Sequence, residues 1–270
     1  MQPDLHWSGR GRRPNASARV ADMNIDLSGR VVAITGASSG IGEATALACV
    51  AAGASVSLAA RRKDRIDALA ARIKDEGGTA IAVGTDVADE RQARAFVEQT
   101  YEHLGRIDAL VNNAGVMLLG PVTGANTDEW RRMVDANLYG VLYCSHAALP
   151  LMQQQGSGHI VNVSSVAGRV SSAGSAVYNL TKWGVNGFSE GLRQEVLDAN
   201  IRVTIIEPGA VETELIGHNN DAVQAAATKR FEGVVPLQAG DVADAIVYAL
   251  SQPEHVSINE VLIRPSRQAR

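Results

Sequence analysis

From Arg30 onward, short runs of β-branched and other apolar residues alternate with longer segments of helical periodicity, and this alternation limits the fold more than any other feature. Short apolar runs separated by helices are typical of repeated βαβ units, whose parallel strands are buried on both faces. The expected strands are residues 31–35, 55–59, 79–83, 109–112, 159–163, 202–206 and 258–263. The expected helices lie at about 40–52, 64–76, 89–104, 128–153, 175–199 and 241–251.

These elements follow one another with short connections, which favours one continuous unit over two. Right-handed crossovers then place helices on both faces of the sheet. The predicted fold is therefore α/β: a Rossmann-like, doubly wound, seven-stranded parallel sheet in a single domain over residues 25–270. With 270 residues, 46% of them hydrophobic, the chain can bury a core of that size. Residues 210–235 are the exception, a polar and Ala-rich insertion long enough to act as a substrate lid.

Residues 1–24 have a different composition, because Gly, Arg, Pro and Ser dominate and no apolar periodicity appears before Ile25. A disordered N-terminal extension is expected there. Both an upstream start before Met23 and a targeting role are open, although the segment lacks the apolar stretch of a secretory signal. No run in the chain approaches the ~20 apolar residues that span a bilayer, so we expect a cytoplasmic protein with no membrane partner.

Charge and cysteine content exclude further classes of protein. The net charge is −4, from 25 basic and 29 acidic residues, so no overall positive field attracts nucleic acid. Cys49 and Cys144 are the only cysteines, and their spacing suggests neither a disulfide framework nor a zinc site. Both are expected to pack as small hydrophobes, and no metal site is expected.

A glycine-rich loop from Thr35 to Gly42 follows the first expected strand and opens the first expected helix. In this context Gly36 permits a tight turn, Gly40 close approach of a pyrophosphate, and Gly42 close helix packing. The helix N-terminus adds free N–H groups and positive potential. We therefore predict a dinucleotide site, against the alternative of a glycine turn that binds nothing. The expected contacts from this loop are Gly36, Ser38, Ser39, Gly40, Ile41 and Gly42.

Two arginines end the second strand, where an acidic residue would normally bind the ribose 2′-hydroxyl of the adenosine. Arg61 and Arg62 can form charge-assisted hydrogen bonds with a 2′-phosphate, and Ser38 can add a hydroxyl. NADP(H) is therefore expected in preference to NAD(H), unless these arginines are ordinary solvated residues at the start of a helix. Asp86 and Val87, after the third strand, are expected near the adenine.

Tyr178 and Lys182 are four residues apart in an expected helix and so share one face. That spacing is common by chance, but Ser165 follows the fifth strand at the carboxyl edge of the sheet, where ligands bind in open α/β folds. A tyrosine with an ordinary pKa near 10 is a poor base at neutral pH unless positive charge stabilises its phenolate. Lys182 and an oxidised nicotinamide would supply that charge and lower the pKa of Tyr178.

Together these motifs resemble the short-chain dehydrogenase/reductase family, over residues 27 to about 265. The matching motifs are, in order, Thr35 to Gly42, Asp86, Asn112 to Gly115, Asn137, Ser165, Tyr178 to Lys182, and Pro208-Gly209 with Thr213. The resemblance implies an NAD(P)-dependent oxidoreductase that acts on CH–OH groups. It also implies a homotetramer, paired through helices 128–153 and 175–199. Trp183, Val185 and Phe188 would then face either the interface or the chain's own core.

The resemblance also implies a role for each matching residue. Tyr178 is the general acid/base, Ser165 holds the substrate oxygen, and Lys182 binds the nicotinamide ribose. Asn137 supports a water relay and Thr213 contacts the carboxamide. The remaining implied cofactor contacts are Asn113, Ala114, Gly115, Pro208 and Gly209.

The expected substrate pocket, formed by residues 116–121, 166–176 and 210–235, is largely apolar and suits a small organic carbonyl or alcohol. Arg169 either clamps a substrate carboxylate or forms a structural salt bridge, and the role of His218 is similarly open. Several segments resemble clavulanic-acid-type aldehyde reductases within the family, and the C-terminal one also resembles serine or 3-hydroxy-acid dehydrogenases. A carbonyl reductase, a 3-hydroxy-acid dehydrogenase and a catalytically silent dinucleotide-binding regulator therefore stand as alternatives.

Overall fold

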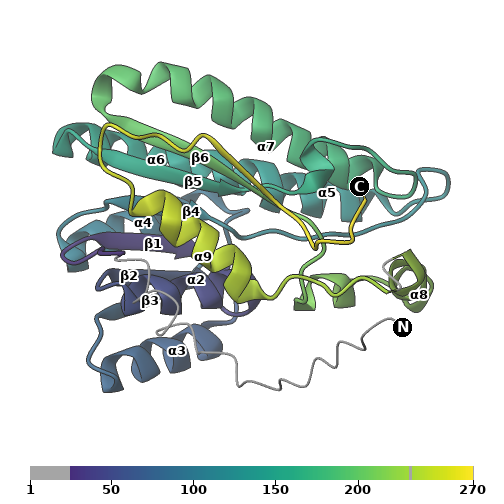
Figure 1. The fold of residues 1–270 in the computed structure, drawn as a ribbon, viewed down its shortest axis with the longest axis horizontal. Helices are drawn as coiled ribbons and strands as arrows, with labels where there is room; N and C mark the ends of the chain where they lie inside the picture. Colours follow the sequence, from purple (N-terminus) through teal and green to yellow (C-terminus); the bar gives the residue numbers. More distant parts are fainter. Residues whose placement is uncertain (1–24, 231–232, 270) are drawn as a thin grey trace, which may run out of the picture.

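The computed structural model describes residues 25–230 and 233–269, so the expected disordered extension, residues 1–24, lies outside the described residues. One parallel seven-stranded sheet runs through its centre in the order β3-β2-β1-β4-β5-β6-β7 (Figure 1). The strands are β1 (Val31–Thr35), β2 (Ser55–Ala60), β3 (Ala80–Gly84), β4 (Ala109–Asn112), β5 (Gly158–Val163), β6 (Ile201–Pro208) and β7 (Glu260–Ile263). The predicted Rossmann-like fold is confirmed, and each strand begins and ends close to its predicted position.

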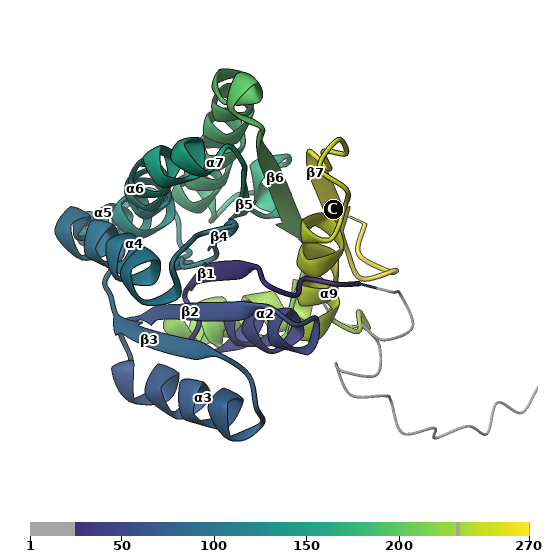
Figure 2. The same cartoon turned by 90° about the vertical axis from the view of Figure 1, so that its left-hand side faces the viewer.

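Helices cover both faces of the sheet, as predicted (Figure 2). One face carries α2 (Gly40–Ala51), α3 (Lys63–Asp75) and α9 (Ala239–Leu250), and the other carries α4 (Glu90–Leu104), α6 (Gly140–Gln155) and α7 (Ala176–Glu195). Side chains alternate across each strand, so Val32 and Ile34 of β1 join the first core while Ala33 joins the second. Burial on both faces is the reason that the strands read as continuous apolar runs.

Two of the expected helices differ in detail from the prediction. The helix expected over 128–153 consists of α5 (Thr127–Val134), a π-helical segment η1 (Asp135–Tyr139) and then α6. The helix expected over 175–199 ends as α7 at Glu195 and is followed by a 3-10 turn, η3 (Leu197–Ala199). Both differences are local changes of hydrogen-bond register, which apolar periodicity alone does not encode.

The insertion at 210–235 contains the 3-10 helix η4 (Glu214–His218) and the helix α8 (Asp221–Arg230). Asn219 fastens it to the loop after β4, because its Oδ1 accepts the Leu119 N–H at 2.6 Å and its Nδ2 donates to the Met117 carbonyl at 2.9 Å. The insertion therefore lies against the carboxyl end of the sheet. Among the described helices, none is both long and apolar enough to cross a bilayer.

Candidate active site

A cleft of about 1110 Å³ opens at the carboxyl ends of the strands. β1 pairs with β2 on one side and β4 on the other, so the winding of the sheet changes direction there, which is where open α/β folds bind ligands. The cleft brings together all of the predicted site residues except Gly42 and Asn137. Those two lie behind its wall, where they support it.

The glycine loop after β1 has the shape that the sequence predicts. Gly36 has a φ of +68°, and a Cβ there would lie 2.8 Å from the Cα of Ala114. A Cβ at Gly42 would overlap the carbonyl oxygen of Gly36, so the start of α2 packs directly on the turn. Only glycine fits these positions without displacing backbone.

Thr35 and Asn113 join the glycine loop to the loop after β4. The Thr35 hydroxyl accepts the N–H groups of Asn113 and Ala114, both at 3.0 Å. The Asn113 side chain in turn donates to the Thr35 carbonyl at 2.9 Å. These three hydrogen bonds hold the glycine loop and the loop after β4 in a fixed relative position at the base of the cleft.

The N-terminus of α2 is open to a ligand. Ser39 is its N-cap residue, with extended backbone and no side-chain capping bond to the helix. The first N–H groups of α2 therefore keep their capacity to bind an anion, which the helix dipole also favours. A pyrophosphate group fits this cradle of glycines and free N–H donors.

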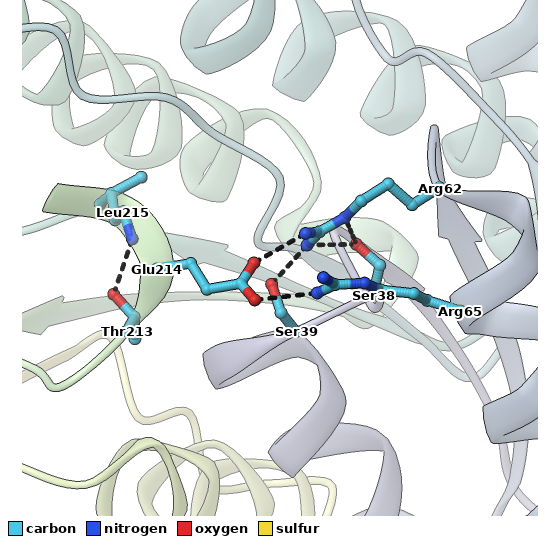
Figure 3. Close-up of polar contacts among 7 residues, drawn as sticks. All are labelled: Ser38, Ser39, Arg62, Arg65, Thr213, Glu214 and Leu215. Carbon is cyan, nitrogen blue, oxygen red and sulfur yellow. Dashed lines mark hydrogen bonds and ion pairs between the residues drawn. The ribbon is translucent and has the colours of Figure 1, made fainter. Parts of the chain in front are cut away.

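At the other end of the cleft, Arg62 contacts both loop serines (Figure 3). Its Nε and NH2 groups donate to the Ser38 hydroxyl at 3.1 and 3.0 Å, and NH2 also donates to the Ser39 hydroxyl at 2.7 Å. Its NH1 group forms an ion pair with Glu214 at 2.7 Å, and Arg65 binds the other oxygen of the same carboxylate at 2.8 Å. Arg61 is exposed beside this group of residues and also lines the cleft.

Ser165, Tyr178 and Lys182 meet in the middle of the cleft. Tyr178 and Lys182 are 8% and 7% exposed, and the Lys182 Nζ lies 5.8 Å from the centre of the Tyr178 ring. Nζ donates to the Val163 carbonyl, at the end of β5, at 2.9 Å. The Ser165 hydroxyl lies 3.4 Å from the Pro208 carbonyl and accepts the Ala167 N–H. The predicted meeting of these three side chains is present.

The pKa of Tyr178 in the protein alone differs from the expectation. Burial raises it to about 12, and only a hydrogen bond with Ser165 opposes that effect. Burial likewise lowers the pKa of Lys182 to about 8. Desolvation therefore disfavours the charged form of both groups in the protein alone. The predicted lowering of the Tyr178 pKa, which also involves an oxidised nicotinamide, stays a prediction.

Asn137 lies beneath the cleft, in the π-helical segment η1, with 1% of its surface exposed. Its Oδ1 accepts the Val116 N–H at 2.8 Å, and its Nδ2 donates to the Val116 carbonyl at 2.9 Å and to the Thr181 hydroxyl at 3.1 Å. Thr181 lies in α7 between Tyr178 and Lys182. Asn137 therefore links the loop after β4 to the helix that carries the two cleft residues.

Arg169 forms a structural ion pair. Its Nε donates to the Glu207 carboxylate at 2.5 Å, and its NH2 group binds Glu260. Glu207 is fully buried, and the Asn186 amide donates to its other oxygen at 2.8 Å. Arg169 does not line the cleft. The salt-bridge interpretation of this residue is the one that the structure supports. His218, by contrast, is exposed at the rim of the cleft.

Sequence reasoning missed Glu214 and Arg65, and it gave no role to the Thr35 hydroxyl. Arg65 follows Arg62 by three residues in a helix, so its position on the same face was readable. Glu214 comes from the insertion, about 150 positions away, and no local pattern connects it to the arginines.

The remaining candidate groups are the possible metal ligands and the two cysteines. Within residues 25–230 and 233–269, no three His, Cys, Asp or Glu side chains are grouped as metal ligands. Cys49 and Cys144 are buried and unpaired, and burial raises the pKa of each thiol to about 12.

The chain is similar in sequence to proteins that are named as oxidoreductases or reductases. An uncharacterized oxidoreductase of Staphylococcus saprophyticus is 44% identical over 244 residues, which cover 89% of this chain and 97% of the relative. A glycine betaine reductase of Emericella nidulans is 40% identical over 264 residues, which cover 96% of this chain but 21% of that protein.

Solved structures agree with these relatives. A serine dehydrogenase complexed with NADP+ has a TM-score of 0.80 and 33% identity, covering 89% of this chain and 96% of that chain. A metagenomic short-chain oxidoreductase in complex with NADP has a TM-score of 0.76 and 32% identity, covering 90% and 99%. The family model for short chain dehydrogenase matches residues 30–224. The family model covers more than half of the chain and the relatives are more than 30% identical, so the chain belongs to the short-chain dehydrogenase family of oxidoreductases.

Proposed function

We propose that the chain is an NADP(H)-dependent oxidoreductase that transfers hydride between the nicotinamide and a small organic carbonyl or alcohol. The observation that carries the proposal is the position of Ser165, Tyr178 and Lys182 in the same cleft as an open helix N-terminus and a pair of arginines. A hydride-transfer site needs both parts, a cradle for the dinucleotide and a proton donor beside the reacting carbon.

The described residues fit a nicotinamide dinucleotide. Gly36, Gly40 and the N–H groups of α2 would hold the pyrophosphate, and Asp86 and Val87 would lie at the adenine. Asn113, Ala114 and Gly115 line the central wall, and Pro208, Gly209 and Thr213 lie on the opposite side, where the nicotinamide would bind. When bound, the cofactor supplies or accepts the hydride.

The protein's own residues manage the proton and the charge on the substrate oxygen. In the direction of reduction, the Tyr178 hydroxyl donates a proton to the carbonyl oxygen, and the Ser165 hydroxyl donates a hydrogen bond to that oxygen as it gains negative charge. In the direction of oxidation, Tyr178 accepts the proton of the alcohol. A cationic Lys182 beside Tyr178 stabilises the phenolate formed in that step. Asn137, bonded to Thr181, holds this part of α7 in place and supports proton exchange.

The preference for NADP(H) is supported by charge. Arg61 and Arg62 line the end of the cleft where the adenosine ribose would lie, and Arg65 binds the same Glu214 carboxylate as Arg62. The end of β2 offers no carboxylate for a 2′-hydroxyl. Arginine suits a phosphate because its planar fork can bind two oxygens at once. Ser38 and Ser39 hold the Arg62 fork at the mouth of the glycine loop.

The substrate walls are mainly apolar, which favours a neutral carbonyl compound or alcohol. Val116, Met117, Val166 and Val170 contribute to them, together with side chains of the 210–235 insertion, which we propose as the lid. The names of the similar proteins point to different substrates, among them serine and glycine betaine, and a third structure is an alcohol dehydrogenase. A 3-hydroxy-acid substrate remains the second candidate, but Arg169 is bound by Glu207 and Glu260 and would not serve as its carboxylate clamp.

Turnover of NADPH with a panel of aldehydes, ketones and 3-hydroxy acids tests the proposal, with Tyr178→Phe as the matched variant. The loss of one hydroxyl is expected to lower kcat by at least about a thousandfold, in the range of general-acid catalysis plus oxyanion stabilisation, with little change in NADPH binding. Undiminished turnover in the variant would contradict the role of Tyr178. Cofactor binding with no turnover of any substrate by the wild type would favour a silent regulator instead.

We also propose a homo-oligomer, which the exposed apolar side chains of α7 support. Leu180 is 59% exposed and Trp183 51%, whereas Val185 is buried in the chain's own core. An interface formed by α7 and its copy would cover these side chains and fix the helix that carries Tyr178. Light scattering coupled to size exclusion would measure the assembly directly, and a monomeric mass would contradict it.

A further inference from the structure

The contact between Glu214 and two arginines at the adenosine end of the cleft has no part in the function proposed above. One carboxylate oxygen accepts from Arg62 at 2.7 Å and the other from Arg65 at 2.8 Å (Figure 3). Two charged hydrogen bonds to two guanidinium groups are what a bound phosphate would make there. The ion pairs lower the pKa of Glu214 to about 2, so its carboxylate is ionised throughout the neutral range.

Four of the five N–H donors of Arg62 already have partners in the protein. Its Nε and NH2 groups are satisfied by the Ser38 and Ser39 hydroxyls, and its NH1 group donates to Glu214. A 2′-phosphate that approaches Arg62 must therefore replace the carboxylate or share the guanidinium with it. Sharing places a dianion against a carboxylate, and like charges at that distance repel.

The position of Glu214 in the chain makes replacement straightforward. Glu214 begins the 3-10 helix η4 in the 210–235 insertion, while Arg62 and Arg65 belong to the start of α3 on the body of the fold. The Glu214 side chain is 49% exposed, so the carboxylate can turn towards water when its place is taken. Replacement needs a rotation of one side chain and no change in the sheet.

We infer that Glu214 is an internal competitor for the 2′-phosphate of NADP(H): its carboxylate occupies the arginine site when no phosphate is bound and reduces the preference of the enzyme for the phosphorylated cofactor. This inference rests on the proposed function, because it takes Arg62 and Arg65 as part of the phosphate site. It adds a residue that sets cofactor specificity from a part of the chain remote from the glycine loop.

The test measures binding without turnover, by calorimetric titration of adenosine 2′,5′-bisphosphate and of ADP into three proteins: wild type, Glu214→Gln and Glu212→Gln. Glu212 is the matched control, because it is two residues away and loses the same charge, but its carboxylate accepts from Gln238 rather than from the arginines. Glu214→Gln is expected to bind the bisphosphate about three- to fivefold more tightly than wild type does, the range of a partly exposed ion pair, with ADP unchanged. Glu212→Gln is expected to leave the ratio of the two affinities unchanged.

The outcomes separate the inference from the function on which it rests. A wild type that binds both ligands equally, with a Glu214→Gln variant that prefers the bisphosphate, supports the competitor while removing the proposed NADP(H) preference of the native enzyme. A wild type that prefers the bisphosphate, with Glu214→Gln behaving like Glu212→Gln, overturns the competitor alone. Weaker binding of the bisphosphate by Glu214→Gln also overturns it, because the carboxylate would then be positioning Arg62 for the phosphate.

Discussion

The Lys182 side chain is ionisable and buried, with 7% of its surface exposed. This burial lowers its pKa from 10.5 to about 8. The unfolded chain holds this proton up to about pH 10.5, whereas the folded protein releases it above about pH 8. Between these values the unfolded state binds more protons, so wild-type stability rises with pH across that window and the full penalty applies below it. At ~1.4 kcal/mol for each unit of pKa, the penalty at pH 7 is about 3 kcal/mol.

Lys182→Met should therefore stabilise the protein without cofactor while abolishing turnover. The gain at pH 7 is expected to be about 1–2 kcal/mol, because the variant also loses the ~1 kcal/mol hydrogen bond to the Val163 carbonyl. Urea unfolding of both proteins from pH 7 to 10.5 measures it. The advantage should shrink as pH rises above about 8 and turn into a small disadvantage near pH 10.5, where mainly the lost hydrogen bond remains. A less stable variant at pH 7 would mean that the ammonium is better solvated than its burial implies.

Which site residues were predictable depends on how far apart the interacting partners are in the chain. Tyr178 and Lys182 lie on one helical face, and Ser38 and Arg62 lie at the carboxyl ends of adjacent strands, so spacing and topology together place them. Glu214 reaches the same arginines from a segment of irregular conformation, which no periodic pattern positions. The pKa of Tyr178 was also beyond the sequence, because it depends on how completely the phenol is buried.

At the scale of elements, the π-helical segment η1 is the feature that turns Asn137 into a support for the cleft. The wider turn at Asp135–Tyr139 interrupts a helix that is otherwise regular from α5 to α6. The Asn137 amide then satisfies both backbone groups of Val116 and reaches the Thr181 hydroxyl. A π-helical turn is less favourable than a regular α-helical turn, so it is rare. Where such turns occur, they are frequent at functional sites.

Asn137→Ala is expected to destabilise the protein by about 2–4 kcal/mol, because the N–H and the carbonyl of Val116 both lose their partner inside the fold. Asn137→Asp is the matched comparison, since its oxygen can still accept the Val116 N–H but it can no longer donate to the carbonyl. We expect Asn137→Asp to lower kcat as well as stability, because α7 is then no longer fixed through Thr181. Denaturant unfolding together with steady-state kinetics separates the two effects. Full activity in either variant would reduce Asn137 to a purely structural residue.

The elements themselves were predictable because each strand is buried on both faces. A doubly buried strand needs an apolar residue at nearly every position, and the linkers between such strands and the helices are short. The π-helical turn and the insertion at 210–235 were not predictable in the same way. Their conformations depend on contacts with other parts of the chain, such as those of Asn137 with Val116 and of Asn219 with Leu119.

At the scale of the whole molecule, the Arg169 ion pairs join three parts of the fold. Arg169 follows the 3-10 turn η2 (Val166–Gly168) after Ser165, and it binds Glu207 at the end of β6 and Glu260 at the start of β7. Glu207 is fully buried, while the Arg169 side chain is 37% exposed. Removing the cation leaves a buried carboxylate with Asn186 as its remaining described partner.

Arg169→Met is expected to cost about 2–4 kcal/mol of unfolding free energy, since a buried charge without its counter-ion is strongly unfavourable. Arg169→Met combined with Glu207→Gln should recover most of the loss, because the buried charge disappears with its partner. Arg193→Met is the control, because it removes an ion pair with the half-exposed Glu190 and should cost less than about 1 kcal/mol. Thermal or urea unfolding of the three variants and the wild type checks the series. Equal losses for Arg169→Met and Arg193→Met would show that Glu207 is not held as a charged group.

The first described residues of the chain make buried contacts with the core. Leu27 is 1% exposed, its N–H donates to the Ala52 carbonyl at 2.7 Å, and Ile25 packs against the same core as Leu27. We propose that the folded domain begins at residue 25, so a chain that starts at Met23 should keep the full stability and activity of the 270-residue protein. A chain that starts at Gly29 loses Leu27 and should be less stable by about 2–4 kcal/mol, the cost of removing one large core side chain. Urea unfolding and turnover of the three chains test this proposal. Lower stability of the chain that starts at Met23 would mean that the first 22 residues contribute to the stability of the fold.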